Sequence, residues 1–406
     1  MNFYIKTLGC KVNQAESDDV TKLLTNFGHT LIKSPINADV IIINTCTVTH
    51  IADRKSRQMI RKLKNENSSA EIIITGCSVE NESSNLPELG TIVKKHELIN
   101  YISRFSFPCN NKATAELSKT RKNILVQNGC NYFCSYCIIP FVRNNLISYP
   151  LDQILSEAQQ NIDLGIKEIV LTGINLGLYN HDGLSLSDLV KKLLLLHGDF
   201  RIRLGSIEPN LVTDELLSLI ETEEKLCPHL HIPLQGTTDN LLKLMQRKYT
   251  LSFYLALVNK IANLKRKTTI TTDIILGHPG ETDEDFSSLL SILNQNIFLN
   301  VHLFAYSVRQ GTQASILPNH VPETIKTERV KIAQKALTVS KENYLRNMIG
   351  VSGSILTEKQ VLGYSEGHTE HYVLCNTKES LPTNNFFSGN YQEVITINNT
   401  LSVSFY

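Results

Sequence analysis

The stretch Asn128-Gly-Cys-Asn-Tyr-Phe-Cys-Ser-Tyr-Cys-Ile-Ile-Pro140 carries the clearest chemical signal in the chain. Its three cysteines, Cys130, Cys134 and Cys137, form a C-x3-C-x2-C run. Soft thiolate ligands select iron–sulfur clusters, zinc or copper(I). Three thiolates can hold three irons of a cubane cluster, and the fourth iron is then open to a chelating ligand. The run therefore predicts a catalytic cluster. The alternative is a zinc knuckle or a chance group of thiols, although closed zinc sites usually have four ligands.

The composition is that of an ordinary globular protein. The 406 residues are enough for two or three domains, and 42% hydrophobic and 19% charged residues are typical values. The net charge of +1 means that an anionic partner has to be bound by a local patch. The nine cysteines are an odd number without disulfide spacing, which predicts a reducing, cytoplasmic compartment. We expect no signal peptide and no membrane partner, because no apolar run is long enough to span a bilayer.

Residues 1–115 alternate between strand and helix patterns. The strand patterns are short apolar runs, mostly β-branched, at Phe3–Leu8, Val40–Ile43 and Ile72–Thr75. The helical patterns between them cover Ser17–Phe27 and Ala52–Lys64. Continuous apolar strands joined by helices favour a parallel sheet that is covered on both faces. We therefore predict an α/β, doubly wound parallel-sheet domain.

Each of these three predicted strands is followed by a cysteine, namely Cys10, Cys46 or Cys77. The carboxyl ends of parallel strands meet at one edge of a sheet, and this edge is where ligands bind. The topology therefore predicts that the three thiols converge on a second three-thiolate cluster site. The alternative is that they are buried, inert cysteines of the kind common in protein cores.

The helix predicted after Cys46 has a basic face. Its positive residues are Arg54, Lys55, Arg57, Arg61, Lys62 and Lys64, whereas Ile51, Ile60 and Leu63 are expected to turn inward. Closely spaced positive charges of this kind can contact the phosphates of RNA. The alternative is a solvated helix face without a partner.

After a polar stretch at residues 116–122, which we interpret as a linker, strand and helix patterns alternate again to about residue 345. The predicted strands are Asn123–Gln127, Glu168–Leu171, Arg201–Leu204, His229–Ile232, Ile270–Leu276 and Asn300–Tyr306. The predicted helices are Leu151–Leu164, Leu186–Leu196, Thr213–Thr222, Asp239–Met245, Leu251–Leu264 and Asp283–Gln295. Six such units predict a partial (βα)6 barrel over residues 122–345, with an active site at the carboxyl ends of the strands.

The strand ends of this barrel carry residues that suit cofactor binding. They are the cysteine run itself, Thr172, Gly173, Ser206, Glu208 and Gln235. Backbone groups near a glycine can approach a ligand closely, and the Ser206 and Glu208 side chains can accept hydrogen bonds from ribose hydroxyls. The alternative is ordinary loop chemistry, in which glycine and polar residues only mark turns.

The C-terminal part changes pattern twice. Pro322–Asn347 predicts one long polar helix. Residues 348–406 then predict a small all-β barrel, with strands at Ser354–Glu358, Tyr372–Asn376, Glu393–Ile397 and Leu401–Phe405. Small β-barrels commonly bind RNA. The alternative is a packing module that covers the open edge of the preceding barrel.

The C-x3-C-x-aromatic-C run resembles the cluster motif of the radical S-adenosylmethionine (SAM) enzymes. Nearly the whole chain is similar to one of their families, the radical SAM methylthiotransferases. The further matching stretches are Thr7-Leu-Gly-Cys-Lys-Val-Asn13, Ile43-Asn-Thr-Cys-Thr-Val-Thr49, Thr75-Gly-Cys77, Leu171-Thr-Gly173, Ser206-Ile-Glu-Pro209, His229-Leu-His-Ile-Pro-Leu-Gln235 and Thr272-Asp-Ile-Ile-Leu-Gly277. Within the family, the first two stretches resemble the branch that modifies N6-threonylcarbamoyladenosine beside the tRNA anticodon.

The resemblance implies the chemistry of the site. Cys130, Cys134 and Cys137 would hold the 4Fe–4S cluster that binds SAM, with Tyr136 beside it. Cys10, Cys46 and Cys77 would hold an auxiliary 4Fe–4S cluster that carries the sulfur to be transferred. One SAM would supply the methyl group of the methylthio group, and another the radical that removes the C2 hydrogen of the adenine.

The resemblance also implies the partners. They are tRNA, bound in part by a C-terminal module of the TRAM type, and a flavodoxin- or ferredoxin-like electron donor. Three alternatives stay open: isopentenyladenosine in tRNA, a ribosomal protein side chain, or a non-enzymatic, zinc-stabilised RNA-binding protein.

The chain departs from the family pattern in a few places. After Pro140 the usual Arg-Gly stretch is Arg143-Asn-Asn-Leu-Ile147, and the usual Gln-Ser-Gly is Gln235-Gly-Thr237. The stretch Phe304–Arg309 lacks the expected prolines, and the C-terminal module is short. No proposed cluster ligand is missing. The remaining cysteines, Cys109, Cys227 and Cys375, match no motif and are expected to be structural.

Overall fold

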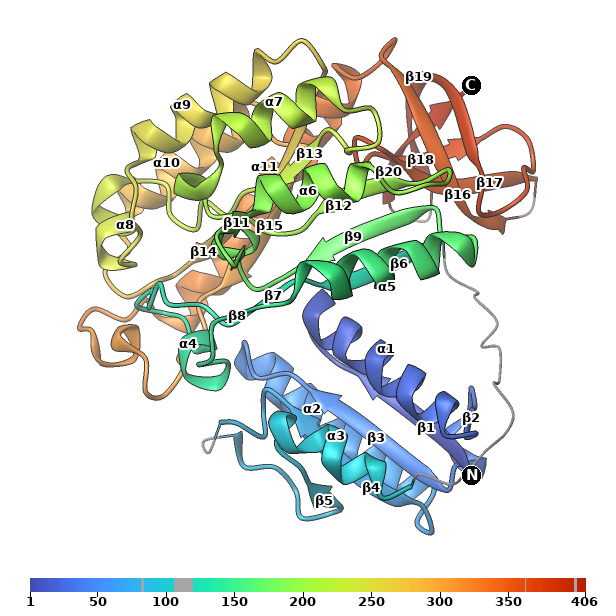
Figure 1. The fold of residues 1–406 in the computed structure, drawn as a ribbon. Coiled ribbons are helices and arrows are strands. Elements are labelled where there is room, and N and C mark those ends of the chain that lie inside the picture. The colour runs from blue at the N-terminus through green and yellow to red at the C-terminus, as the bar shows by residue number, and fades with distance from the viewer. Residues whose placement is uncertain (82–83, 106–119, 362, 398–399) are drawn as a thin grey trace. The chain divides into compact units, whose positions relative to one another are not determined.

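The computed structural model describes residues 1–81, 84–105, 120–361, 363–397 and 400–406. The chain forms two compact units, each built from several segments (Figure 1). The first unit contains Met1–Glu116, Asn128–Leu146 and Ser307–Ser315, and the second contains Leu117–Gln127, Ile147–Tyr306 and Ile316–Tyr406. Cys109 and the first part of the predicted linker lie outside the described residues.

The first unit is built on a parallel sheet with the strand order β2-β1-β3-β4-β5. Its strands are β1 (Asn2–Thr7), β2 (Thr30–Leu31), β3 (Val40–Thr45), β4 (Glu71–Gly76) and β5 (Thr91–Ile92). Its longer helices are α1 (Lys11–Asn26), α2 (His50–Glu66) and α3 (Lys95–Ser103).

Alternate side chains of β3 are buried on opposite faces of this sheet. Val40 and Ile42 pack in a cluster with residues of α1 and α3, whereas Ile41 and Ile43 pack with Ile60 and Leu63 of α2. All six residues of β3 are buried, as expected for a central strand covered on both sides. The predicted doubly wound sheet is therefore confirmed.

The second unit contains the six strands that the sequence predicts. They are β6 (Arg121–Leu125), β9 (Glu168–Thr172), β12 (Arg201–Leu204), β13 (His229–His231), β14 (Thr269–Leu276) and β15 (Asn300–Ala305). The first three pair in parallel in the order β12-β9-β6, and the last three in the order β13-β14-β15. Parallel bridges from Ile202 to Leu226 and from Ser206 to His231 join the two sheets. The result is a six-stranded arc, as the partial barrel predicts.

Helices connect or follow the strands of this arc. They are α5 (Leu151–Asp163), α6 (Leu186–Leu194), α7 (Asp214–Thr222), α8 (Asp239–Leu244), α9 (Leu251–Ala262), α10 (Asp283–Asn294) and α11 (Glu323–Arg346). Short elements connect them: β7 (Gln127–Asn128), β8 (Ile147–Ser148), β10 (Asn180–His181) and β11 (Leu184–Ser185), while α4 (Ile139–Val142) belongs to the first unit.

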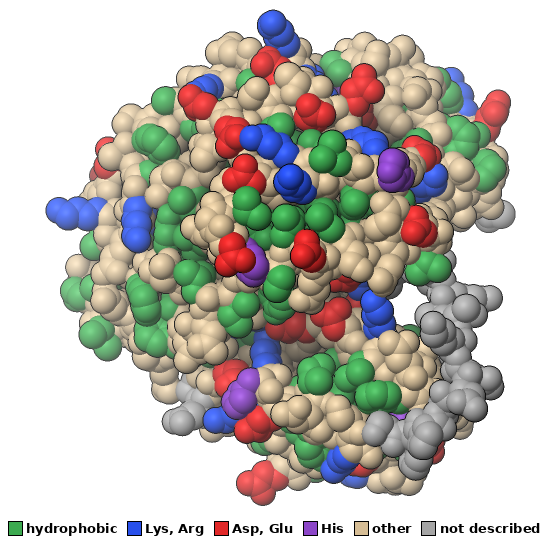
Figure 2. Space-filling view, viewed as in Figure 1, with side chains coloured by type: hydrophobic (Ala, Val, Ile, Leu, Met, Phe, Trp, Pro, Cys, Tyr) green, Lys and Arg blue, Asp and Glu red, His purple; other side chains and the backbone are tan. Residues whose placement is uncertain are grey.

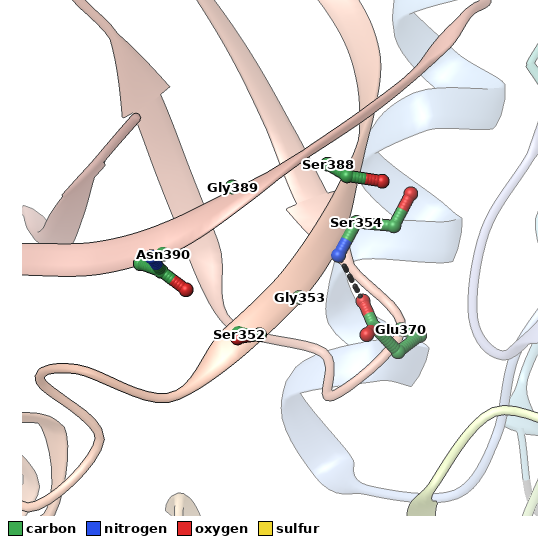
Figure 3. Close-up of a pocket in the computed structure, with 7 residues that line it drawn as sticks. All are labelled: Ser352, Gly353, Ser354, Glu370, Ser388, Gly389 and Asn390. Carbon is green, nitrogen blue, oxygen red and sulfur yellow. Dashed lines mark hydrogen bonds between the residues drawn. The ribbon is translucent and has the colours of Figure 1, made fainter.

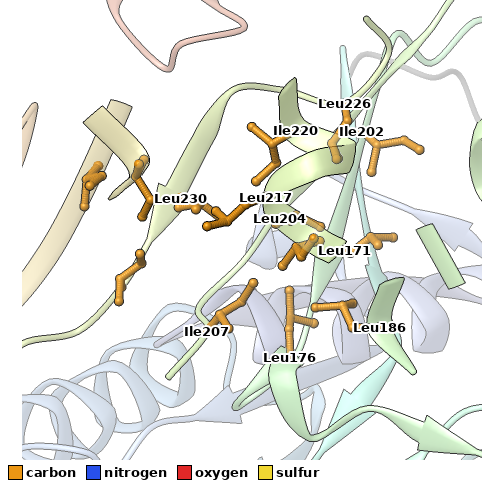
Figure 4. Close-up of a cluster of buried hydrophobic side chains, with 14 of the residues drawn as sticks. Leu171, Leu176, Leu186, Ile202, Leu204, Ile207, Leu217, Ile220, Leu226 and Leu230 are labelled. Atoms are coloured by element: carbon orange, nitrogen blue, oxygen red, sulfur yellow. The ribbon is translucent and has the colours of Figure 1, made fainter. Parts of the chain in front are cut away.

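The core of the second unit lies between the strands and these helices. Leu171 of β9 and Ile202 and Leu204 of β12 pack with Leu217 and Ile220 of α7 (Figure 4). Burying a side chain of this size stabilises the fold by about 1.5–3 kcal/mol. This packing fixes the strands, and therefore also the loops at their carboxyl ends.

The C-terminal strands pair in a ring. They are β16 (Ser352–Val361), β17 (Tyr364–Thr369), β18 (Leu374–Thr377), β19 (Phe386–Ile397) and β20 (Thr400–Phe405), and each pairs with two neighbours. The sequence predicts only four of these strands. The one it misses is β17, whose inward residues are Ser365, Gly367 and Thr369, so no hydrophobic alternation marks it.

Other expectations at the residue level are wrong. Helix α1 begins at Lys11, six residues before the predicted start, because Val12 and Ala15 are already buried against the sheet. Ile51 does not turn inward, since 56% of it is exposed. Arg121 and Lys122 are part of β6 rather than of a linker.

Candidate functional site

The structure brings the thiols of Cys10, Cys46 and Cys77 together at one edge of the first unit's sheet. The three residues lie just after β1, β3 and β4. The Sγ atoms of Cys10 and Cys77 lie 3.9 and 3.8 Å from the same atom, Asn13 Oδ1. A Cβ atom added at Gly9 would lie only 2.9 Å from Cys46 Sγ.

Glycines make this close approach possible. Gly76 has a φ of +103°, and a Cβ there would lie 2.4 Å from backbone atoms of Thr45 on the neighbouring strand. Gly9 has a φ of +100° directly before Cys10. Side chains are disfavoured at such φ values, so glycine allows the chain to turn toward the other thiols at both strand ends.

The electrostatics of the three thiols favour a bound cation. Burial, with smaller contributions from the neighbouring thiolates of Cys77 and Cys10, raises the pKa of the Cys46 thiol to about 11. Thiolates held so close together repel one another unless a positive centre lies between them. This donor set of three soft ligands fits a cluster better than it fits structural zinc, which usually has four ligands.

Cys130, Cys134 and Cys137 are half-buried on the loop before α4 in the same compact unit. Cys137 N donates to Cys134 O at 2.9 Å, which folds the loop into a turn. Ile138, directly after the last of these cysteines, and Val142 of α4 pack in one apolar cluster with Cys77. The two sets of cysteines are therefore neighbours in the fold. Tyr136, also half-buried, lies in this loop.

Sequence reasoning gave no role to Arg143, whose side chain donates hydrogen bonds to several residues of this region. Its side chain is only 1% exposed, and its Nε donates to Cys77 Sγ at 3.3 Å. Its Nη1 donates to Glu16 Oε1 at 2.8 Å, and its Nη2 to Asn13 Oδ1 at 2.7 Å. Lys95 Nζ also donates to Cys77 Sγ at 3.3 Å. The signal in the sequence was a lone arginine directly after the apolar run that follows the cysteines.

A second buried arginine, Arg309, was also missed. Its Nη1 pairs with Asp53 Oδ2 at 2.7 Å, and its Nη2 donates to Thr47 Oγ1 at 2.6 Å, one residue after Cys46. In the same segment, Ala314 N donates to Ser135 O at 2.7 Å. Residues 307–315 therefore contact the loops of both cysteine sets.

In the second unit, the predicted cofactor residues all lie at or just after strand ends. Ser206 forms a parallel bridge with His231, and Gln235, with a φ of +67°, donates its backbone N–H to Asp273 O at 2.8 Å. Glu208 pairs with Arg247, and burial raises the pKa of this carboxyl although the arginine opposes the shift.

Two of these residues offer mainly their backbone. Thr172 is 2% exposed and its Oγ1 donates to Val170 O at 3.2 Å, so its side chain is engaged within its own strand. Gly173 lies beside Gln127, where a Cβ would approach Gln127 Oε1 to 3.0 Å. Gln127 in turn accepts from Asn175 N at 3.0 Å.

A polar group for which the sequence gave no role lies on β13, β14 and β15. The ligand atoms of His231, Asp273 and His302 lie within 4.8 Å of one another. His231 Nε2 is 3.3 Å from Asp273 Oδ2, and its Nδ1 is 2.9 Å from Thr271 Oγ1. The neighbouring residues Leu230 and Ile274 pack in the hydrophobic core, so this group faces the other side of the sheet.

The predicted RNA-binding residues differ in how available they are. Arg54, Lys55 and Arg61 are exposed on α2, whereas Arg57 Nη1 donates to Ser84 O at 2.9 Å. On the face drawn in Figure 2, basic and acidic side chains are interspersed, in keeping with the net charge of +1. Of the four predicted residues, Arg54, Lys55 and Arg61 therefore lie on the exposed surface.

The C-terminal strands carry a shallow polar pocket of about 530 Å³ between β16 and β19 (Figure 3). Its lining consists of small or polar residues: Ser352, Gly353, Ser354, Glu370, Ser388, Gly389 and Asn390. Glu370 Oε2 accepts from Ser354 N at 2.7 Å, so its carboxylate is engaged with the strand. The lining contains no basic side chain.

Comparison with known proteins places the chain in a class. Residues 2–95 match the family described as uncharacterized protein family UPF0004, and residues 124–293 match the radical SAM superfamily. The fold resembles the radical SAM methyltransferase TsrM from Kitasatospora setae, with a TM-score of 0.56 and 14% identity over 78% of this chain and 77% of that one. The chain is therefore a radical SAM enzyme, and such enzymes use SAM and a 4Fe–4S cluster.

Two curated relatives define the family. The threonylcarbamoyladenosine tRNA methylthiotransferase MtaB of Thermotoga maritima is 37% identical over 390 residues, covering 91% of this chain and 89% of that protein. The tRNA-2-methylthio-N(6)-dimethylallyladenosine synthase of Endomicrobium trichonymphae is 30% identical over 384 residues, covering 91% and 92%. The chain belongs to the radical SAM methylthiotransferase family. Within the described residues, no helix is long and apolar enough to cross a membrane.

Proposed function

We propose that this enzyme adds a methylthio group to C2 of N6-threonylcarbamoyladenosine in tRNA. The observation that carries the proposal is that two sets of three cysteines lie in one compact unit, where Cys77 packs with Ile138 beside Cys137. A methylthiotransferase needs a radical source and a sulfur source close to each other. The 37% identity to the Thermotoga protein supports the choice of substrate.

Cys130, Cys134 and Cys137 would hold the cluster that binds SAM, and Cys10, Cys46 and Cys77 would hold the auxiliary cluster. When bound, the first cluster would supply the electron that cleaves SAM to methionine and a deoxyadenosyl radical, and the second would supply the sulfur; side chains alone can provide neither. The chain's own contribution is to hold the thiols in place through the strand ends and the left-handed glycines before Cys10 and Cys77.

SAM would be bound at the strand ends of the second unit. Ser206 and Glu208 would accept hydrogen bonds from its ribose hydroxyls, while Thr172 and Gly173 would offer backbone groups and Gln235 its amide. The pairing of Glu208 with Arg247 fixes the direction of the carboxylate before SAM arrives, which lowers the cost of ordering it. Tyr136 would lie against SAM from the cluster loop.

The substrate would be tRNA, held by Arg54, Lys55 and Arg61 and by the C-terminal strands, with Arg57 contributing less because of its contact with Ser84. A flavodoxin- or ferredoxin-like protein would supply electrons. We propose the domain division 1–115, 122–345 and 348–406 for these roles. The compartment would be the cytoplasm, where tRNA and reduced thiols coexist.

The decisive experiment is mass spectrometry of tRNA nucleosides from cells with and without the gene. We expect 2-methylthio-N6-threonylcarbamoyladenosine to disappear and its unthiolated precursor to accumulate. In the purified enzyme, Cys46→Ala should abolish thiolation but keep reductive SAM cleavage. Cys227→Ala, which removes a buried cysteine outside both sets, is the matched control and should thiolate normally.

A second candidate substrate is isopentenyladenosine in tRNA. The 30% identity to the Endomicrobium enzyme over 91% of this chain favours it to a lesser degree. Loss of 2-methylthio-isopentenyladenosine in the same experiment would show that isopentenyladenosine is the substrate. The proposed methylthiolation chemistry would then be unchanged. An unchanged nucleoside profile would refute both.

A further inference from the structure

We propose that Arg143 and Lys95 set the reduction potential of the auxiliary cluster by donating hydrogen bonds to the thiolate of Cys77. This inference rests on the proposed function, because it assumes that Cys77 is a cluster ligand. Arg143 and Lys95 are positioning residues that belong to neither cysteine set. Arg143 lies in the segment Asn128–Leu146, and Lys95 is the first residue of α3.

All five N–H donors of Arg143 are engaged, so its orientation is fully determined. Nε donates to Cys77 Sγ at 3.3 Å, and Nη1 donates to Glu16 Oε1 and to Asn128 Oδ1, both at 2.8 Å. Nη2 donates to Asn13 Oδ1 at 2.7 Å and to Glu16 Oε2 at 3.1 Å. The contact to the sulfur is therefore a fixed part of a closed network, and rotation of the guanidinium would break the other bonds.

Glu16 holds the two cations in place. Its carboxylate accepts from both nitrogens of the Arg143 fork and from Lys95 Nζ at 3.1 Å. Burial favours the neutral acid, but the two cations outweigh burial and hold the pKa of Glu16 below its usual value. The carboxylate therefore stays charged, and it fixes both donors at 3.3 Å from the Cys77 sulfur.

The effect on a cluster follows from charge. A ligand sulfur that accepts hydrogen bonds from cations donates less electron density to its iron. The reduced cluster carries one more negative charge than the oxidised one, so the cations stabilise the reduced form and raise the potential. A purely structural role, in which Arg143 only anchors its segment to the sheet, predicts no change in potential once the cluster is bound.

The test uses full-length protein in which Cys130, Cys134 and Cys137 are replaced by alanine, so that only the auxiliary cluster remains. Iron content is measured first, and the potential is then determined by a redox titration followed by EPR. In Arg143→Met the ratio of reduced to oxidised cluster at a fixed potential should fall about tenfold, which corresponds to 59 mV for a one-electron couple. Arg143→Lys should give a smaller shift in the same direction, and so should Lys95→Met.

Two further variants keep the test decisive. The double variant Arg143→Met with Glu16→Gln removes opposite charges together, so it protects the fold if the single variant is unstable. Arg329→Met is the matched control, because Arg329 is a buried arginine that pairs with two carboxylates, Glu281 and Asp283. It should leave the potential unchanged.

The outcomes separate the two claims. Parent protein without bound iron would overturn the proposed auxiliary site, and this inference with it. A parent that binds iron but keeps the same potential in all Arg143 and Lys95 variants would overturn the inference alone. A potential that falls equally in Arg329→Met would also contradict it, since the effect would then be one of general destabilisation.

Discussion

Glu168 is the residue whose replacement should most weaken the second unit. It is fully buried on β9, and it pairs with Arg121 Nε at 2.7 Å, Arg201 Nε at 2.6 Å and Arg203 Nη2 at 2.9 Å. Arg201 Nη1 also donates to Ser354 O at 3.0 Å on β16. One carboxylate therefore organises three arginines that connect the six-stranded arc to the C-terminal strands.

The variant Glu168→Gln keeps the shape of the side chain and removes its charge. The three guanidinium groups then lack their shared anion in a buried place. Removing one partner of a buried ion pair costs about 3–5 kcal/mol, and we expect a loss of this size in the free energy of unfolding. Because whole proteins are stable by only about 5–15 kcal/mol, the loss should lower the unfolding midpoint markedly.

The pH dependence of the free energy of unfolding follows from the lowered pKa of Glu168. Burial raises the pKa of Glu168, but Arg203, Arg201 and Arg121 outweigh burial and hold it well below the ordinary value. Such a group contributes stability that is present above its unfolded pKa of about 4.3, and this stability is lost as the pH falls through the folded pKa. The difference between wild type and Glu168→Gln should therefore be constant from about pH 8 to about pH 5, since the carboxyl is ionised in both states there.

The assay is urea unfolding followed by circular dichroism, at several pH values in this range. The control is Glu215→Gln, which removes a half-exposed carboxylate that pairs with Lys191 on the surface and should cost only about 0–1 kcal/mol. A loss for Glu168→Gln of less than about 1 kcal/mol, no larger than that of the control, would show that the arginines do not depend on this anion.

Three further predictions concern the proposed site. Gly76→Ala should lower the iron content and the unfolding midpoint, because the new Cβ would lie 2.4 Å from backbone atoms of β3, whereas Gly183→Ala, with open space around its Cβ, should keep its iron. Glu208→Gln should weaken SAM binding about tenfold in calorimetry at unchanged iron content, since it removes one charge-assisted hydrogen bond. Combining Arg54→Gln and Arg61→Gln should weaken tRNA binding and reduce its dependence on salt, by about 0.9 in log–log slope for each phosphate that these arginines neutralise; an unchanged slope would contradict RNA contact by α2.

The sequence predicts the strands well where burial is complete. Every residue of β3 and of β9 is buried, and the apolar runs Val40–Ile43 and Ile169–Leu171 mark the two strands in the sequence. Parallel topology then placed the cysteines at one sheet edge without any knowledge of side-chain positions. The strand β17 could not be found in this way, because small and polar residues face the interior of its ring.

Long-range polar contacts could not be predicted either. Arg143 and Glu16 are 127 positions apart, and Arg309 and Thr47 are 262 apart. No periodicity or spacing links such pairs, since their meeting depends on how whole segments pack. A charged residue within an apolar stretch is the most that the sequence shows, and it does not name the partner.

The structure shows the surroundings of two residues at which the chain departs from the family pattern, Gly236 and Thr237. Where the family has serine, a Cβ at Gly236 would lie 3.2 Å from both Leu241 Cγ and Met245 Sδ, so a larger side chain would be crowded. Where the family has glycine, Thr237 is 2% exposed and donates its Oγ1 to Asp285 O at 3.0 Å.

Gln235, directly before these two positions, has a left-handed backbone with a φ of +67°. Asn144, which replaces the glycine after Arg143, is not among the described residues with positive φ, so nothing in its backbone conformation demands a glycine. Arg143, which contacts Cys77 of the proposed site, is the residue of its stretch that matches the family pattern. The departures at Asn144, Gly236 and Thr237 therefore leave the contact between Arg143 and Cys77 in place.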